Sequence, residues 1–546
     1  MSNNKNMKSY EYNSFFPYPS IRDQQKVAIE FAIDSFLNND KRFCIVEAGT
    51  GVGKSAIGLT VARALADNMP DNDLITSGSY FITTQKILQQ QYVDDFKSVV
   101  SLKSSSNYQC SFKKSNTCSE SQQALRTAEK SSKFFKKCFH ECVYKKQKQR
   151  FLDSAESITN FSYFLTEANL SGKIVPRQVL VIDEGHNIES ALSKFVEVGV
   201  SEFFVKSILG VSFPKNMTQF RAYKWIEEKY LPMVKKKVSH FEKMIDQFGG
   251  EKFREKLAQF QKITKQHDLL KGHFSKLQRF VNIYDRENWV FDLEWSDVKG
   301  YKRLSFKPID VSQYSEDVLF KLGIKVLILS ATILNRDTFC KTLGIPRSDS
   351  SFLTLPSPFP SENRPVIFSP VGSMSAKAID RTLPKLTNAV REILEHHKNE
   401  KGIIHCKTFK IAKYLNEHLK DIRVLIHDSS NRDRVLNLHL TSDKPTVLLS
   451  PSMSEGVDLK GDTSRFQIIC KVPYPYLGDK LIRKRMNRVK GWYELQTAKL
   501  IVQSAGRSVR SVEDYATTYI LDSDFDRFLN KASDMFSEDF KKCIIQ

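Results

Sequence analysis

The sequence predicts an α/β protein with two parallel-sheet domains, the first of which carries two inserts. Three observations support this prediction. Short apolar stretches typical of buried strands recur along the chain, the first of them runs directly into a glycine-rich loop and a helical pattern, and two long segments break the alternation. At 546 residues the chain is too long for one hydrophobic core, so we expect two to four domains.

The glycine-rich loop follows the first predicted strand, residues 42–46, and reads Glu-Ala-Gly-Thr-Gly-Val-Gly-Lys-Ser over 47–55. A strand, a loop of this kind and a helix bind phosphate through backbone N–H groups, with Lys54 on the outer phosphates and Ser55 on Mg²⁺. A chance glycine-rich turn is disfavoured by the complete Gly-Lys-Ser ending. The predicted phosphate-binding residues are Ala48, Gly49, Thr50, Gly51, Val52, Gly53, Lys54 and Ser55.

Two further predicted strands of the first domain end in polar residues. Residues 179–182 lead into Asp183 and Glu184, and residues 325–329 lead into Ser-Ala-Thr at 330–332. The carboxyl edge of a parallel sheet is where phosphoryl transfer takes place, so we expect Asp183 to hold Mg²⁺ and Glu184 to orient or deprotonate the attacking water. The Ser-Ala-Thr segment is placed to sense the γ-phosphate.

A second parallel sheet is predicted from residues 402–406 and 446–450. The second of these strands leads to Gly456 and Asp458, and the run Gln-Ser-Ala-Gly-Arg-Ser-Val-Arg follows at 503–510. On a helix Arg507 and Arg510 share one face and can reach a phosphate together, although a surface salt-bridge pair has the same spacing. The order of the motifs favours a nucleotide site completed by Gln503 and the two arginines.

Four cysteines lie in the first insert, with seven, nineteen and three residues between them: Cys110, Cys118, Cys138 and Cys142. Thiolates at this spacing suit either zinc or an iron–sulfur cluster, and the spacing alone leaves both open. Unligated buried thiols are disfavoured because the surroundings are polar and basic. The remaining cysteines occur singly and are expected to be small buried hydrophobic residues: Cys44, Cys340, Cys406, Cys470 and Cys543.

The second insert has a helical period, with apolar residues at gaps of three and four. Their pattern predicts an antiparallel helical hairpin interrupted at Gly249 and Gly250. Lys235–Lys237, between the apolar positions, could line a passage for DNA. The apolar positions are Leu231, Val234, Val238, Phe241, Ile245, Phe248, Phe253, Leu257, Phe260, Leu270, Phe274, Leu277 and Val281.

Positive charge is concentrated in these inserts. Residues 101–150 contain 12 Lys and Arg against 3 Asp and Glu, and residues 201–280 contain 17 against 8, so the two segments hold 18 of the 21 net charges. Such a concentration favours a surface for a polyanion such as nucleic acid over a general lysine-rich solubility bias. With no signal-peptide core at the start and no apolar run of membrane-spanning length, we expect an intracellular, cytoplasmic or nuclear, protein with reduced thiols.

The ordered motifs resemble those of superfamily 2 helicases and, in detail, the XPD/DinG branch of iron–sulfur DNA helicases. The resemblance covers almost the whole chain. Besides the motifs above, it is carried by Arg22-Asp-Gln-Gln25, Leu102-Lys103, Asn107-Tyr108-Gln-Cys110, Cys142-Val-Tyr144, Asn160-Phe-Ser-Tyr163, Ser357-Pro-Phe359 and Pro473-Tyr-Pro475.

The resemblance implies an ATP-dependent DNA helicase, active in DNA repair or replication, that moves 5′ to 3′ on single-stranded DNA and opens forked DNA. It further implies a 4Fe–4S cluster on the four cysteines, adenine recognition by Arg22 and Gln25, and a monomeric motor. Strand contacts are expected from Phe81-Ile-Thr-Thr84 with Leu88 and Gln91. A DNA-dependent ATPase that remodels complexes without separating strands is the alternative. One departure is Gly185, which stands where the family has Ala and is expected to add backbone freedom with a modest effect on rate.

The resemblance also implies a domain layout. The expected boundaries are 1–103 for the first part of a RecA-like motor domain 1, 104–148 for the iron–sulfur insert, 149–189 for the acidic motif of motor domain 1, 190–302 for the helical Arch insert, 303–345 for the last part of motor domain 1, and 346–546 for RecA-like motor domain 2.

Overall fold

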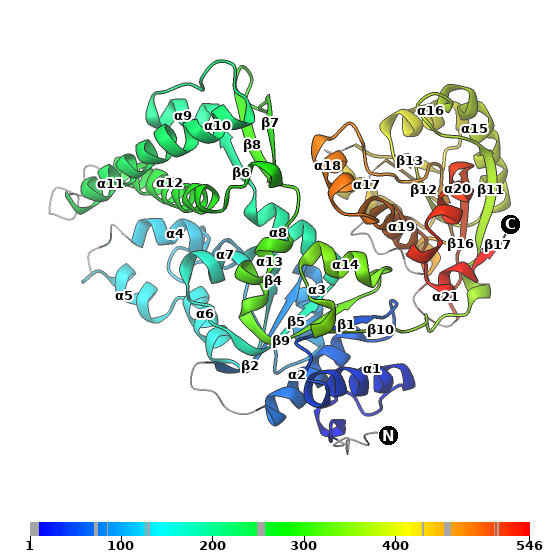
Figure 1. Cartoon of the computed structure of the whole chain (residues 1–546), viewed down its shortest axis with the longest axis horizontal. Coiled ribbons are helices and arrows are strands. Elements are labelled where there is room, and N and C mark those ends of the chain that lie inside the picture. The colour runs from blue at the N-terminus through cyan, green and yellow to red at the C-terminus, as the bar shows by residue number, and fades with distance from the viewer. Residues whose placement is uncertain are drawn as a thin grey trace.

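The structure, a computed structural model, describes residues 10–69, 75–84, 86–125, 128, 131–247, 257–428, 431–451, 459, 461–506, 508–509, 511 and 513–545. The chain forms two α/β domains, each built on a parallel seven-stranded sheet, and a helical insert that stands beside them (Figure 1). The predicted α/β fold with two parallel sheets is confirmed.

The first sheet has the strand order β10-β1-β9-β5-β2-β4-β3. Alternate residues of β1 face opposite sides, because Phe43 and Ile45 belong to one buried cluster and Cys44 and Val46 to another. Both faces are therefore covered. The strands are β1 (Phe43–Glu47), β2 (Thr76–Thr83), β3 (Val100–Ser101), β4 (Glu156–Asn160), β5 (Arg177–Asp183), β9 (Gly323–Ser330) and β10 (Ser350–Thr354).

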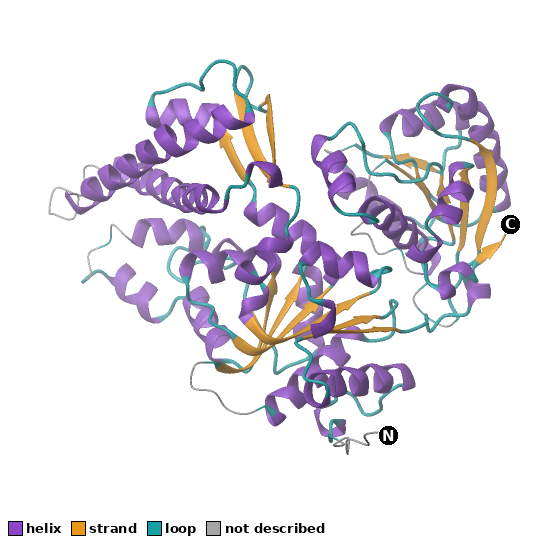
Figure 2. Ribbon diagram, viewed as in Figure 1, coloured by secondary structure: helices purple, strands orange, loops and turns teal. Residues whose placement is uncertain are grey.

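Helices cover both faces of this sheet (Figure 2). Residues of α1, α2 and α3 belong to one buried cluster, and residues of α7, α8, α13 and α14 belong to the other. The helices are α1 (Asp23–Ile33), α2 (Lys54–Asn68), α3 (Lys86–Asp95), α7 (Phe161–Thr166), α8 (Ile188–Val196), α13 (Ser312–Val318) and α14 (Arg336–Leu343).

The second sheet has the order β13-β14-β12-β15-β16-β11-β17. Because β10 pairs with β1, the first sheet extends to residue 354, and the boundary expected at residue 346 falls before its last strand. The strands are β11 (Val366–Gly372), β12 (Gly402–His405), β13 (Val424–Ile426), β14 (Val447–Ser450), β15 (Phe466–Ile469), β16 (Thr517–Asp522) and β17 (Ile544–Ile545). The helices are α15 (Ile379–His396), α16 (Phe409–Leu419), α17 (Arg432–Thr441), α18 (Lys480–Arg488), α19 (Trp492–Ala505), α20 (Asp524–Lys531) and α21 (Glu538–Lys541).

The cysteine insert joins β3 to β4 and contains three helices, α4 (Cys118–Leu125), α5 (Lys133–His140) and α6 (Val143–Asp153). The helical insert contains the expected hairpin as α11 (Leu231–Gln247) and α12 (Leu257–Ile283). The apolar positions Phe248 and Phe253 and the predicted interruption at Gly249 and Gly250 lie outside the described residues. Helix α12 packs against α4, so the two inserts touch.

The helical insert also contains a small antiparallel sheet, β6-β8-β7, which the helical periodicity did not reveal. The strands of this sheet are β6 (Val198–Ser201), β7 (Trp289–Trp295) and β8 (Lys302–Pro308). Two further helices of the insert are α9 (Glu202–Leu209) and α10 (Gln219–Trp225). None of the helices in the described parts of the chain is long and apolar enough to cross a bilayer.

Candidate functional site

The phosphate loop connects the carboxyl end of β1 to the start of α2. Gly51 and Gly53 have φ values of 85° and 88°, a left-handed conformation that glycine adopts without strain. Space also requires glycine, because a Cβ at Gly53 would lie 2.3 Å from Gln25 Nε2 and one at Gly51 would lie 2.5 Å from the Phe359 ring. The loop is thus held from two sides.

The side chains of Arg22 and Gln25 lie against this loop. Arg22 Nη1 donates to the carbonyl of Gly51 at 2.9 Å, and Gln25 Nε2 donates to the carbonyl of Val52 at 2.9 Å. The two residues also contact each other, since the Arg22 N–H donates to Gln25 Oε1 at 3.0 Å. Arg22 and Gln25 therefore support the phosphate loop. The family resemblance implies that the same two residues recognise the adenine.

Lys54 and Asp183 face each other across the carboxyl edge of the sheet. The Lys54 ammonium donates to the carbonyls of Ala48 and Gly49 at 3.2 and 3.3 Å. Burial raises the pKa of Asp183, and the positive charge of Lys54 opposes that shift. The Tyr92 hydroxyl donates to Asp183 Oδ2 at 3.2 Å. An acidic group beside an ammonium and Ser55 can hold Mg²⁺ on a phosphate.

Glu184 follows with a left-handed backbone, φ 57° and ψ 46°, which is uncommon for a residue with a side chain. Its carboxylate Oε2 lies 3.3 Å from His186 Nδ1, and His186 Nδ1 also lies 2.8 Å from Ser330 Oγ. The carbonyl of Ser330 accepts the N–H of Ala48 at 2.9 Å. The acidic motif, the Ser-Ala-Thr segment and the phosphate loop are therefore directly connected.

The side chain of His186 is 10% exposed and is neutral. Burial lowers its pKa well below the usual 6.5, and the charges of Lys499 and Lys54 lower it further. Amide N–H groups of Asn187 and Gln503 point at Nε2, at 2.9 and 3.0 Å, so Nε2 is the acceptor and the proton lies on Nδ1. His186 therefore links the first domain to the second.

Gln503 reaches the site from α19 of the second domain. In addition to His186, its Nε2 donates to Thr332 Oγ1 at 3.3 Å, and its Oε1 is buried without a donor among the described residues. An unpaired buried acceptor is costly, so this oxygen is available to a further group in the site. The predicted site residues Gly456, Asp458, Arg507 and Arg510 lie outside the described residues.

The four cysteines of the insert are all buried and come from separate segments. Cys118 begins α4, Cys138 lies in α5 and Cys142 is the N-cap of α6. Cys118 Sγ and Cys142 Sγ are 3.6 Å apart, and Cys138 lies close enough to Cys110 and Cys142 to interact electrostatically with both. The fold has brought thiols that are up to 32 positions apart in the sequence into one buried group.

The electrostatics of the thiols differ. Burial and the neighbouring sulfurs of Cys142 and Cys138 raise the pKa of Cys118 to about 12. Burial also raises the pKa of Cys110, but the nearby Ser121 hydroxyl and the N–H groups of Lys113 and Phe112 outweigh it, and the net pKa is lowered.

The donor set is four cysteine sulfurs, which as thiolates suit an iron–sulfur cluster or a zinc ion. No three His, Cys, Asp or Glu side chains in the described ranges are arranged around a single metal ion. A cluster bound by one thiolate on each iron would need Cys118 Sγ and Cys142 Sγ to move apart from their present separation of 3.6 Å.

Two family models match the chain. Residues 393–543 match the helicase C-terminal domain, and residues 19–215 match the type III restriction enzyme res subunit. The DinG helicase of Photobacterium profundum is 26% identical over 41% of this chain and 35% of its own length. The YoaA helicase of Escherichia coli is 24% identical over 40% of this chain and 36% of its own length. The chain therefore matches about a third of each of these two relatives.

A probable ATP-dependent helicase of Methanocaldococcus jannaschii is 23% identical over 93% of this chain and 92% of its own length. A solved XPD helicase has a TM-score of 0.61 at 15% identity and covers 94% of this chain and 99% of its own. The Xpd4 protein of S. tokodaii has a TM-score of 0.56 at 16% identity, covering 96% and 99%. The chain is thus similar in sequence to the DinG and YoaA helicases and similar in fold to solved XPD helicases.

Gly185 stands where the family's acidic motif has Ala, and the structure gives a steric reason for glycine at this position. Its φ is not positive, so the position does not require the conformational freedom of glycine. A Cβ would instead lie 2.3 Å from Ile328 Cγ2 on the adjacent strand β9, and Ile328 is fully buried. Gly185 therefore makes room for a branched side chain, and its expected effect on rate stays a prediction.

Several residues at the site of this XPD/DinG-like chain were not found by sequence reasoning. Tyr92 contacts Asp183 and Ser55, and only its helical spacing after the second strand could have indicated it. Ser357 and Phe359 belong to a motif that was assigned no role in the site, yet they pack against Gly49 and Gly51 of the phosphate loop. Phe81, expected to contact a DNA strand, is buried in the core against Tyr92, so its side chain is not available.

Proposed function

We propose that this protein is an ATP-dependent DNA helicase that moves 5′ to 3′ on single-stranded DNA and separates strands. The observation that carries the proposal is the meeting of both domains around one buried histidine. Gln503 of the second domain contacts His186 and Thr332, which lie next to Lys54, Asp183 and Glu184 of the first. A site shared in this way makes domain closure depend on nucleotide.

In this proposal the residues of the first domain perform hydrolysis. The phosphate loop and Lys54 bind and neutralise the β- and γ-phosphates. Ser55 and Asp183 would hold Mg²⁺, which would supply further positive charge at the phosphates. Glu184 orients the attacking water and accepts its proton. Neutral His186 fixes the Glu184 side chain, and Gln503 ties its other face to the second domain. Arg507 and Arg510 would stabilise the developing charge.

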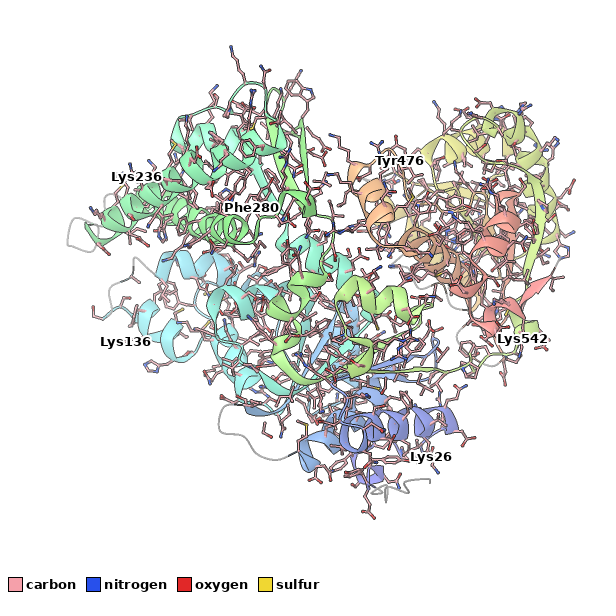
Figure 3. All side chains as sticks on the ribbon, in the orientation of Figure 1. Lys26, Lys136, Lys236, Phe280, Tyr476 and Lys542 are labelled. Atoms are coloured by element: carbon pink, nitrogen blue, oxygen red, sulfur yellow. The ribbon has the colours of Figure 1, made fainter. Side chains whose placement is uncertain are left out.

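DNA contact is supported by the lysines of both inserts. On α11, Val234 and Val238 are buried, whereas Lys235 and Lys236 are exposed on the opposite face. On α5, Lys136 is exposed in the same way. Figure 3 labels Lys136 and Lys236, which lie on neighbouring inserts. Two basic inserts that touch each other above one motor domain are suited to guide a polyanion.

Polarity and strand separation are tested together on duplexes with a single 5′ or 3′ tail. We expect ATP-dependent strand separation on the 5′-tailed duplex and little on the 3′-tailed one. Active DNA-stimulated ATPase with no separated product on either substrate would favour the alternative, a remodelling ATPase. Product on the 3′-tailed substrate alone would reverse the proposed direction.

We further propose that Cys110, Cys118, Cys138 and Cys142 hold a 4Fe–4S cluster that stiffens the insert as a wedge for duplex DNA. Iron and sulfide analysis with a visible absorption spectrum of anaerobically purified protein tests this. We expect Cys138→Ser to lose iron and unwinding while retaining part of the ATPase. Cys340→Ser, which changes a buried thiol in α14, is the matched control. A colourless wild-type protein with stoichiometric zinc would contradict the cluster.

A further inference from the structure

Helix α19 contacts the first domain along one face. Trp492, Gln496, Lys499 and Gln503 are spaced by four, three and four residues, which places them in one stripe of the helix. Trp492 and Gln496 reach Glu189, and Lys499 and Gln503 reach His186. Helix α19, which ends at Ala505 shortly before Arg507 in the sequence, thus packs against residues 186–189, which follow the acidic pair.

Glu189, in the first turn of α8, is the acceptor at the other end of this stripe. The Trp492 indole N–H donates to its two carboxylate oxygens at 3.0 and 2.9 Å. Gln496 Nε2 donates to Oε2 at 3.4 Å, and Arg485 Nη1 lies 3.1 Å from Oε1. All three donors come from the second domain, so this carboxylate is an interdomain anchor next to the catalytic segment.

Arg485, on α18, extends this anchor to the helical insert. The residue is 8% exposed, and its Nη2 donates to Ser193 Oγ at 2.9 Å and to the carbonyl of Pro308 at 3.0 Å. Its Nε donates to the carbonyl of Ile309 at 3.0 Å. Ser193 lies where the chain enters the helical insert and residues 308–309 lie where it returns. One guanidinium therefore binds both connections of the insert.

The planar guanidinium suits this position better than any other cation. It has five N–H donors in a fixed geometry, and four of its contacts here point in different directions. A lysine ammonium is too compact to reach all of them. A second contact lies farther out on the same helix, where Lys480 Nζ approaches Asp292 Oδ1 of β7 at 3.6 Å. Lys480 is exposed, and at this distance the pair adds little energy.

We propose that Arg485 is a positioning residue that couples the helical insert to nucleotide-driven movement of the second domain. The proposal rests on the proposed function, since it assumes that ATP moves one motor domain against the other. Movement of α18 and α19 then pulls on both connections of the insert at once through Arg485. It also acts on Glu189 next to the hydrolysis residues.

Coupling is measured by energy transfer between dyes attached through non-natural amino acids, which leaves the native cysteines untouched. One label pair, at Asp67 and Ile422, reports on the two motor domains. A second pair, at Asp67 and Lys299, reports on the helical insert. All three positions are exposed. In the wild type we expect a non-hydrolysable ATP analogue to change both distances.

Arg485→Met should leave the motor-domain change in place. It should lower the equilibrium constant for the shifted position of the insert roughly tenfold, because hydrogen bonds to charged groups are worth about that factor or more. Arg485→Lys should give an intermediate loss. Arg488→Met removes an equal charge from the exposed side of the same helix and should behave as wild type. A thermal midpoint close to wild type in each variant separates lost coupling from lost folding.

The proposal is overturned if the insert of Arg485→Met shifts as far as that of the wild type. It is also overturned if the distance between Asp67 and Lys299 in the wild type does not change when the nucleotide binds. The assay needs nucleotide only. A protein that shows the coupled shift but separates no strands would therefore disprove the helicase proposal and leave the role of Arg485 standing.

Discussion

The two halves of the nucleotide site are built in different ways. In the first domain, β1, β9 and β5 are neighbouring parallel strands, so the residues that follow their carboxyl ends meet without any further arrangement. In the second domain, the contribution comes from one stripe of α19 that crosses the domain boundary. The first half is therefore set by strand order, and the second depends on how the domains are oriented.

This difference indicates that the first domain carries the residues for hydrolysis and that the second domain controls them. A half that is formed within one domain can bind phosphate in any orientation of the two domains. A half that arrives from the other domain can stop or permit hydrolysis, because small rotations break contacts of about 3 Å such as that between Gln503 and His186. The following substitutions separate the two halves, beginning with the largest expected effect.

Lys54→Ala removes the charge of the first half. We expect the DNA-stimulated ATPase to fall at least about a hundredfold, since preorganised charge at the phosphates supplies several kcal/mol of catalysis. Steady-state ATPase measurement checks this. Lys26→Ala, on the exposed side of α1, removes the same charge beside the same domain and should keep wild-type activity. Equal activity in both variants would remove Lys54 from the site.

Gln503→Ala removes the contact of the second half with His186 and Thr332. We expect kcat to fall about fivefold with a smaller change in KM, because one neutral hydrogen bond contributes about 1 kcal/mol. Stopped-flow or steady-state kinetics over a range of ATP concentrations distinguish the two constants. A rise in KM alone would show that Gln503 binds nucleotide rather than linking the domains.

Gly185→Ala tests how tightly the acidic motif packs within the first half. The added methyl group would press on Ile328, and overpacking of this kind costs about 1 to 3 kcal/mol. Thermal unfolding measures the loss, and Ile328→Ala in the same protein should restore part of it. Gly272→Ala, where a Cβ meets nothing within 4 Å on α12, is the control and should be neutral or stabilising.

Replacing His186 should have the smallest effect, a change in how the stability of the protein depends on pH. Its pKa is lowered in the folded state, so below its usual value of 6.5 the unfolded chain binds the proton more readily. The stability that neutral His186 contributes is present above 6.5 and lost as the pH falls. Thermal midpoints should drop less steeply between about pH 7 and pH 5 in His186→Gln than in wild type. His240→Gln, on the exposed side of α11, should keep the wild-type slope.

The strand-end motifs were predictable because their residues are consecutive. Asp183 and Glu184 lie at the end of an apolar strand, and Lys54 ends the loop that follows another. A parallel sheet brings such strand ends together by its own geometry. The helical hairpin was predictable for a similar reason, since its apolar stripe has the period of a helix. The β6-β8-β7 sheet was not, because its strands are short and lie on both sides of that hairpin.

By itself, the sequence determined the two parallel sheets, the phosphate loop, the acidic pair and the four cysteines as one group. Each of these depends on spacing within a short segment or on a motif in a fixed order. Only the tertiary structure decided that Gly185 yields space to Ile328, that Tyr92 meets Asp183, and that Arg485 joins Glu189 to the connections of the helical insert. These contacts link residues from 91 to almost 300 positions apart, and no local pattern records which distant side chains will meet.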